Sequence, residues 1–120
     1  MYIDYTKWED VSIVKGERLR AYSLLAVTIL FEGIATMLLR LASDKGFVWL
    51  AFAYCFYGGA FAIFPEVLKV VNVGEAYAIW SGAGCVVTAL GGRVFFGEEL
   101  SIFKLCSILV ILTGVCGVML

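Results

Sequence analysis

The chain has 120 residues, of which 62% are apolar or aromatic and only 16% charged, and its mean hydropathy is +0.98. A soluble domain carries about 25% charged residues, and a domain this small buries too little surface to hide so many apolar side chains. Nine basic and ten acidic residues leave a net charge of −1, which gives no sign of a nucleic-acid-binding surface. The composition therefore indicates a membrane protein and excludes a soluble catalytic domain.

Four windows of the sequence carry almost no charge, and a spanning helix needs about 17–25 residues. With their flanks, these windows predict transmembrane helices over residues 21–42, 47–65, 75–96 and 100–120. Residues 1–20 are expected to form a polar N-terminal extension, and residues 21–120 a single transmembrane domain. Spanning β-strands would alternate over about 10 residues, whereas these runs are apolar on every side. The predicted fold class is an all-α membrane protein with four transmembrane helices.

One acidic residue interrupts the first span. Glu32 stands eleven residues after Ala21, about 16 Å along a helix that rises 1.5 Å per residue, and so near the bilayer midplane. A carboxylate at that depth costs about 2.5–3.5 kcal/mol and normally carries function. Thr28 and Thr36, one turn to either side, are expected to share its face. Because such an acid can hold a proton or pair with a cation, it can couple two flows; the alternative is a hydrogen bond that only joins helices.

The second span, 47–65, follows a predicted turn at residues 43–46 and is crowded with aromatic residues, Tyr57 among them. Pro65, the only proline, is expected either to end this helix or to kink its last turn. Residues 72–74 are expected to form the next connection.

One face of the third span combines aromatic, hydroxyl and glycine residues, with Trp80 beside it. Aromatic ring faces attract organic cations by about 0.5–2 kcal/mol each, and glycines let helices approach closely. Trp80 lies several residues inside the span, away from the interface that tryptophan prefers, so the face is predicted to bind a cation. An ordinary packing surface is the alternative. The members of this face are Tyr77, Ser81, Gly84, Thr88 and Gly91.

The fourth span places Ser107, Gly114 and Gly117 at the spacing of a helix-packing seam. Four short helices are too few to enclose a ligand cavity at the bilayer midplane, so we expect a dimer with this seam between the subunits. The four cysteines match no zinc spacing, and the sequence predicts no metal site, no cofactor and no enzymatic activity. The partners expected are the lipid bilayer, an organic cation and protons, with no nucleic acid.

The basic residues give little bias to the orientation in the membrane. Five flank the bilayer on the side of the N-terminus and the second connection, and four on the other side. Orientation normally follows an excess of lysine and arginine on the cytoplasmic side. This count fits either a weakly determined single orientation or a chain that inserts both ways round. The five are Lys7, Lys15, Arg18, Arg20 and Lys69, and the four are Arg40, Lys45, Arg93 and Lys104.

Over about residues 22–117 the chain resembles the small multidrug resistance family of proton-coupled cation exporters. The most specific part is the run from Gly74 to Gly84, which is similar to the family's G-x-A-Y-A-x-W-x-G-x-G motif. Residues 31–33 with Thr36 and Arg40 resemble its first-helix motif, residues 95–98 its last loop, and residues 113–115 its fourth-helix seam.

The resemblance implies a homodimer of two oppositely inserted copies in the cell (cytoplasmic or inner) membrane, with both central acids in one chamber. By position, Glu32 would bind proton and substrate. Gly82 and Gly84 would mark the flexible point of the third helix, and Ser107 stands where many members have glycine. The other implied chamber residues are Tyr22, Thr36, Tyr57, Tyr77, Trp80 and Ser81.

The departures from the family pattern bear on the substrate. Ala35 and Ala60 replace the tryptophan and serine of the guanidinium-exporting branch, which favours the broader quaternary-cation branch. Pro65 and Glu75 are not typical; Glu75 can complement a helix dipole and receives no transport role here. The alternatives are a subunit of a paired exporter for polyamines or guanidinium compounds, and a lipid-carrier flippase component. A proton-carrying rotor subunit has no use for the aromatic third helix.

Overall fold

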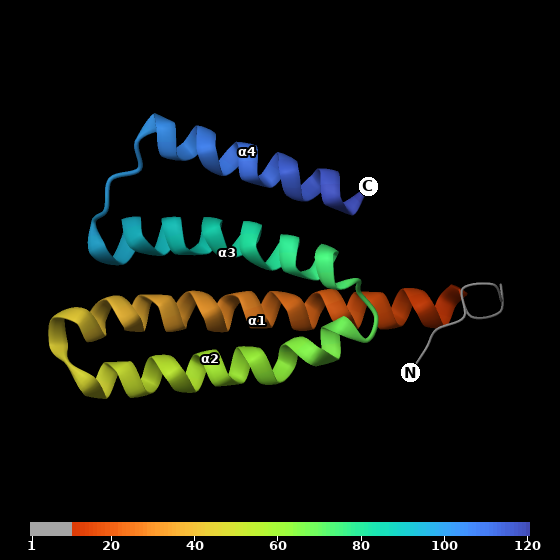
Figure 1. Ribbon diagram of the computed structural model, residues 1–120, viewed down its shortest axis with the longest axis horizontal. Coiled ribbons are helices and arrows are strands. Elements are labelled where there is room, and N and C mark those ends of the chain that lie inside the picture. The colour runs from red at the N-terminus through yellow and green to blue at the C-terminus, as the bar shows by residue number, and fades with distance from the viewer. Residues whose placement is uncertain (1–10) are drawn as a thin grey trace.

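The computed structural model describes residues 11–120, with side chains described from Lys15 onward. Residues 1–10 of the expected N-terminal extension, including Lys7, lie outside the described residues. Four helices alternate in direction (Figure 1): α1 Val11–Lys45, α2 Phe47–Leu68, α3 Val73–Phe96 and α4 Ile102–Met119. All four are long and apolar enough to cross a membrane. The predicted all-α fold with four spanning helices is confirmed.

The helix ends differ from the apolar windows because polar residues continue a helix without contributing to hydropathy. α1 begins at Val11 and runs through the predicted turn to Lys45, so that Gly46 alone separates it from α2. Gly46 has a φ of +104°, a backbone conformation that glycine adopts without steric cost. Pro65 lies inside α2, which continues to Leu68. Pro65 therefore does not end the second helix.

α1 is the central helix of the bundle. It packs against α2 on one side and α3 on the other, and within the described chain α4 packs only against α3 (Figure 1). A buried apolar cluster joins the first three helices along the N-terminal half of α1. Its members are Ala21, Leu25, Ile29, Val67, Val71 and Ala76.

Glycines hold α1 and α3 unusually close together along their parallel course. A Cβ atom at Gly33 of α1 would lie 2.6 Å from Val87 Cγ1, and one at Gly91 of α3 would lie 2.9 Å from Met37 Cε. At Gly33 the β-branched Val87 leaves no room for a side chain, whereas at Gly91 the end of the flexible Met37 side chain would have to shift. Small residues of this kind allow helix backbones to approach in a membrane. The two contacts fix the register of the α1–α3 seam on which the site described below depends.

α4 is the most exposed helix, with no buried residue. Its contact with α3 includes Gly82, where an added Cβ would lie 2.6 Å from Val115 Cγ2. The surface predicted as a seam is open: Ser107 is exposed, and a Cβ at Gly114 would meet nothing within 4 Å. Ser107 also borders a hollow that Cys85 and Ala89 of α3 help to line.

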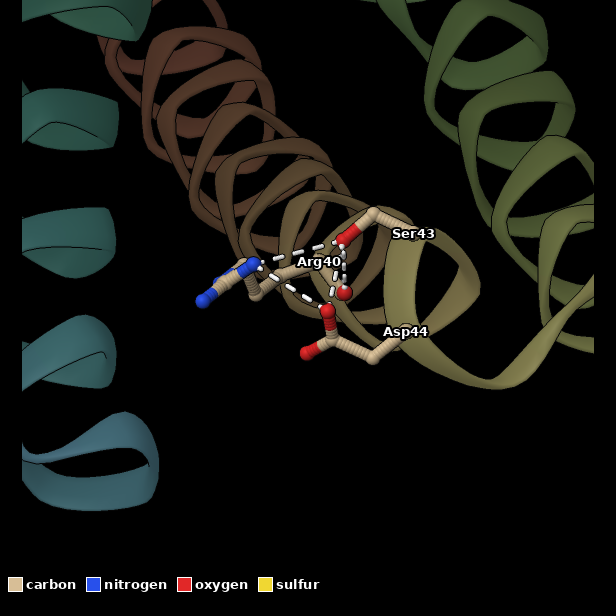
Figure 2. Close-up of polar contacts among 3 residues, drawn as sticks. All are labelled: Arg40, Ser43 and Asp44. Carbon is tan, nitrogen blue, oxygen red and sulfur yellow. Dashed lines mark hydrogen bonds and ion pairs between the residues drawn. The ribbon is translucent and has the colours of Figure 1, made fainter.

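Charged groups gather at the ends of α1. At its C-terminal end, Arg40 forms an exposed ion pair with Asp44 at 3.5 Å and donates to Ser43 Oγ at 3.3 Å (Figure 2). Its guanidinium carbon also lies 5.9 Å from the ring centroid of Phe96. Exposed pairs of this kind contribute about 0–1 kcal/mol. Arg40 is eight residues from Glu32, or about 12 Å along the helix, so its backbone position lies two turns from the acid.

The Gly82 contact predicts a position-specific cost for a larger side chain. Gly82→Val should destabilise the protein by about 1–3 kcal/mol, because Val115 is β-branched and cannot move aside freely. Gly74→Val on the same helix is the matched control, since its Cβ would meet nothing within 4 Å. Thermal unfolding in detergent measures both. Equal stability of the two variants would contradict the close α3–α4 contact.

Candidate functional site

The carboxyl group of Glu32 lies against the backbone of α3. Glu32 is half-buried, and a Cβ built at Gly84 would lie only 2.8 Å from its Oε2 atom. Glycine at position 84 therefore makes the space that the carboxyl group occupies. The ion pairs among the described side chains lie elsewhere, between Arg40 and Asp44 and between Lys69 and Glu66. Since no described cation neutralises Glu32, its carboxyl group is available to a proton or to a bound cation.

Thr36 and Tyr57 place hydroxyl groups one turn from Glu32. Thr36 Oγ1 donates to the backbone oxygen of Glu32 at 2.9 Å and lies 3.0 Å from the hydroxyl oxygen of Tyr57. This second contact joins α1 to α2 beside the acid. The structure thus brings together the predicted site residues Glu32, Thr36 and Tyr57.

Trp80 forms the centre of an aromatic cluster contributed by α2 and α3. The ring centroids of Phe64, Phe61 and Tyr77 lie 4.9, 5.7 and 5.7 Å from that of Trp80. Trp80 is one helical turn before Gly84, and the Glu32 carboxyl group contacts α3 at Gly84. The indole N–H is buried, forms no hydrogen bond of ordinary geometry with a described residue, and lies within reach of the Glu32 carboxyl group. The cluster therefore presents aromatic surface within about one turn of the acid.

Tyr22 lies farther along the same seam. Its hydroxyl donates to Glu75 Oε1 at 2.5 Å, across the interface between α1 and α3. Tyr22 was predicted as a chamber residue, whereas Glu75 was given no transport role. Ten residues separate Tyr22 from Glu32, which places them about 15 Å apart along the helix.

Three other residues have surroundings that their spacing does not predict. Thr28 is fully buried, and its hydroxyl donates to the Leu24 carbonyl, so it does not extend an open polar stripe from Glu32. Ser81 is exposed, and its hydroxyl donates to the Tyr77 carbonyl of its own helix. Tyr77 is itself 59% exposed. Ser81 and Tyr77 thus face outward from the chain, although Tyr77 also touches Trp80.

Phe61 and Phe64 are site residues that the sequence analysis missed. Both belong to the aromatic-rich second span, and their spacing of three residues puts them on one helix face. That spacing was the available signal, but it does not say which helix the face contacts. Glu75 gave a weaker signal, as an atypical acid at a helix start.

Comparison with known proteins agrees with this architecture. The family described as Small Multidrug Resistance protein matches residues 20–111. The chain is 39% identical to the uncharacterized membrane protein YvaE of Bacillus subtilis over 76% of this chain and 77% of the relative. It is 35% identical to the quaternary ammonium compound-resistance protein QacF of Klebsiella aerogenes over 81% and 89%, respectively. A guanidinium exporter of Proteus vulgaris is 43% identical over 44% of this chain and 51% of its own length.

The family match spans most of the chain, and the relatives YvaE and QacF align over about three quarters or more of both proteins. The four apolar helices agree with a multi-pass protein of the cell membrane. The chain belongs to the Small Multidrug Resistance family, whose members are membrane transporters and not enzymes.

Proposed function

We propose that this protein is a proton-coupled antiporter that exports hydrophobic or quaternary organic cations, with Glu32 shared between proton and substrate. The observation that carries the proposal is the half-buried carboxyl group of Glu32, in the middle of an apolar helix, without a described cation beside it. Intramembrane acids of this kind normally face a pathway for ions or substrates. Proton and cation compete for the same carboxylate, so binding of one releases the other. Coupling follows if the site opens to one side of the membrane at a time.

The aromatic cluster supports an organic cation as the substrate. Trp80 with its neighbours Phe61, Phe64 and Tyr77 offers ring faces and edges near the acid, and ring faces attract cations. The relative QacF is named for resistance to quaternary ammonium compounds, which agrees with this chemistry.

Two buried alanines favour a hydrophobic cation over a guanidinium ion. Ala35 and Ala60 are both fully buried, and neither carries a polar side-chain atom. The side chains at these two positions therefore supply no hydrogen-bond acceptor to a small planar cation. A bulky quaternary cation, which donates no hydrogen bond, needs only the carboxylate and the aromatic surface.

We further propose that the working unit is a homodimer of two oppositely inserted copies. The open face of α4 at Ser107 and Gly114 supports a subunit interface there, since small residues at this spacing favour helix packing in membranes. The near balance of basic residues supports dual insertion. Two opposed copies would form from one gene the inverted repeat that many transporters carry within one chain.

Glu32→Gln tests the exchange. The amide can neither release a proton nor attract a cation by charge, so proton-driven export should fall to background while insertion and folding persist. Transport of tetraphenylphosphonium by proteoliposomes under a pH gradient measures this. Glu66→Gln is the control, because Glu66 is exposed and paired with Lys69. Export by the Glu32→Gln protein at the wild-type rate would end the exchange proposal.

Two added lysines test dual insertion. Asn72→Lys with Gly74→Lys should raise the basic count on that side from five to seven and fix the second connection in the cytoplasm. Asn72→Gln with Gly74→Gln controls for the substitutions themselves; both positions are exposed. A single cysteine at position 99, with the native cysteines replaced, should be labelled from both sides in the control and from one side in the lysine variant. If the single-cysteine protein without the lysine or glutamine substitutions is labelled from one side only, the antiparallel homodimer is wrong. A parallel dimer or a pair with a related subunit would then take its place.

A further inference from the structure

An apolar hollow of about 650 Å³ runs along the surface where α1 meets α3. This α1–α3 groove is lined by residues of α1 between Leu30 and Leu41 and by residues of α3 between Val87 and Phe96. Every lining residue is apolar or glycine, and neither α2 nor α4 contributes one. Leu30 and Val94 on its walls are exposed, so the described chain leaves the groove open to its surroundings.

The α1–α3 groove lies on the face of α1 opposite to Glu32. Leu30 precedes Glu32 by two residues and Ile34 follows it by two, and at 3.6 residues per turn a shift of two residues is about half a turn. No acidic residue lines the groove, so a cationic substrate would find no counter-charge there. The groove is therefore separate from the site proposed for exchange, and its apolar lining suits a hydrocarbon chain.

The length of the groove corresponds to one leaflet of the bilayer. Leu30 and Leu41 are eleven residues apart, or about 16 Å along the helix, and half of the hydrocarbon core of a bilayer is about 15 Å thick. Leu30 is two residues from Glu32, near the midplane, so Leu41 lies near the end of the hydrocarbon region. The groove thus extends from the midplane toward the headgroups, as the acyl chain of a phospholipid does.

A lysine stands where the groove approaches the headgroup level. Lys45 follows Leu41 by four residues, about one turn, and therefore continues the face of α1 that lines the groove. Lys45 is exposed and forms no ion pair with another described residue. Its ammonium group is available to an anionic partner at this depth.

The acidic residues at the same end of the bundle are placed away from the groove. Asp44 pairs with Arg40 at 3.5 Å (Figure 2). Glu98 lies over α3, where a Cβ built at Gly92 would be 2.6 Å from its Oε2 atom. Glu98 and Glu99 line a different hollow, between α3 and α4. The charge at the headgroup end of the groove is therefore the positive charge of the lysine.

We propose that the α1–α3 groove binds one acyl chain of an anionic phospholipid, whose phosphate group pairs with Lys45. Basic groups beside hollows between transmembrane helices bind phospholipid headgroups in this way. A zwitterionic phospholipid offers the same chain without a net charge, so it should bind less tightly. The proposal does not depend on the exchange at Glu32, because Glu32 does not line the groove. The bound chain would contact both α1 and α3 and so stabilise the packing of one against the other.

The charge contact is tested by adding lipid to the full-length protein. Protein freed of lipid in detergent is titrated with dioleoylphosphatidylglycerol, which is anionic, or with dioleoylphosphatidylcholine, which has the same chains and is zwitterionic. Native mass spectrometry counts the bound lipids and reports the oligomeric state. Lys45→Gln removes the proposed contact. Lys104→Gln is the matched control, because Lys104 is exposed at the same end of the bundle but belongs to α4 and does not line the groove (Figure 1).

The apolar part of the site is tested by filling the groove. Val94→Trp places a large ring where the acyl chain would lie. Val48→Trp makes the same change on α2, at a position that does not line the groove. The two valines are 72% and 65% exposed, so neither substitution has to displace a packed core.

We expect the wild-type protein to bind phosphatidylglycerol about fivefold more tightly than phosphatidylcholine, the effect of one basic residue near an anionic headgroup. Lys45→Gln should remove this preference, and Lys104→Gln should keep it. Val94→Trp should weaken the binding of both lipids about fivefold or more, because the ring takes the place of buried methylene groups. Val48→Trp should leave both affinities unchanged.

Three results would each overturn the inference: equal wild-type affinities for the two lipids, equal effects of Lys45→Gln and Lys104→Gln, or equal effects of Val94→Trp and Val48→Trp. Two other occupants of the groove have their own signatures. Loss of the wild-type oligomer in Val94→Trp, with lipid binding unchanged, would assign the groove to a second copy of the chain. Weaker binding of tetraphenylphosphonium by Val94→Trp, with lipid binding unchanged, would assign it to the substrate.

Discussion

The structure depends on the placement of one carboxyl group at a depth where the bilayer offers no water. Glu32 costs about 2.5–3.5 kcal/mol at the centre of a spanning helix, and the described residues around it do not offset that cost with a cation. What they offer instead is space at Gly84, a hydroxyl on its own turn at Thr36, and aromatic surface at Trp80. In the exchange that we propose, an acid in these surroundings is neutralised by what it binds, either a proton or a cation from outside the chain.

The close α1–α3 contact is what gives the acid its position. Gly33 and Gly91 allow the two helices to approach each other just beyond the level at which Glu32 meets Gly84, toward the C-terminal ends of both helices. A wider separation would move the carboxyl group away from the α3 turn that begins at Trp80. The same contact aligns Tyr22 with Glu75. Small residues without chemistry of their own therefore determine which polar groups meet.

Much of the fold and part of the site could be predicted from sequence, because both follow from local patterns. The apolar runs are sufficient to predict four spanning helices, and the single acid that interrupts the first run is sufficient to single out Glu32. Hydropathy does not encode helix ends, however, and α1 begins at Val11 because polar residues continue the helix. Single-helix spacing put Thr28 beside Glu32 but could not reveal that packing buries its side chain fully. The bond from Tyr22 to Glu75 joins residues 53 positions apart. The residue spacing within a single helix cannot predict a contact between residues of two different helices.

The most direct test of a shared site is the count of protons released when a cation binds. Tetraphenylphosphonium is added to purified protein in weakly buffered detergent solution at several values between about pH 5 and 9. Where Glu32 is protonated, binding must displace the proton, so we expect the wild-type protein to release protons, with weaker apparent affinity at lower pH because the two ligands compete. The Glu32→Gln protein should release none. Tight binding by the wild-type protein without proton release at any pH in this range would contradict the sharing of Glu32 between proton and substrate.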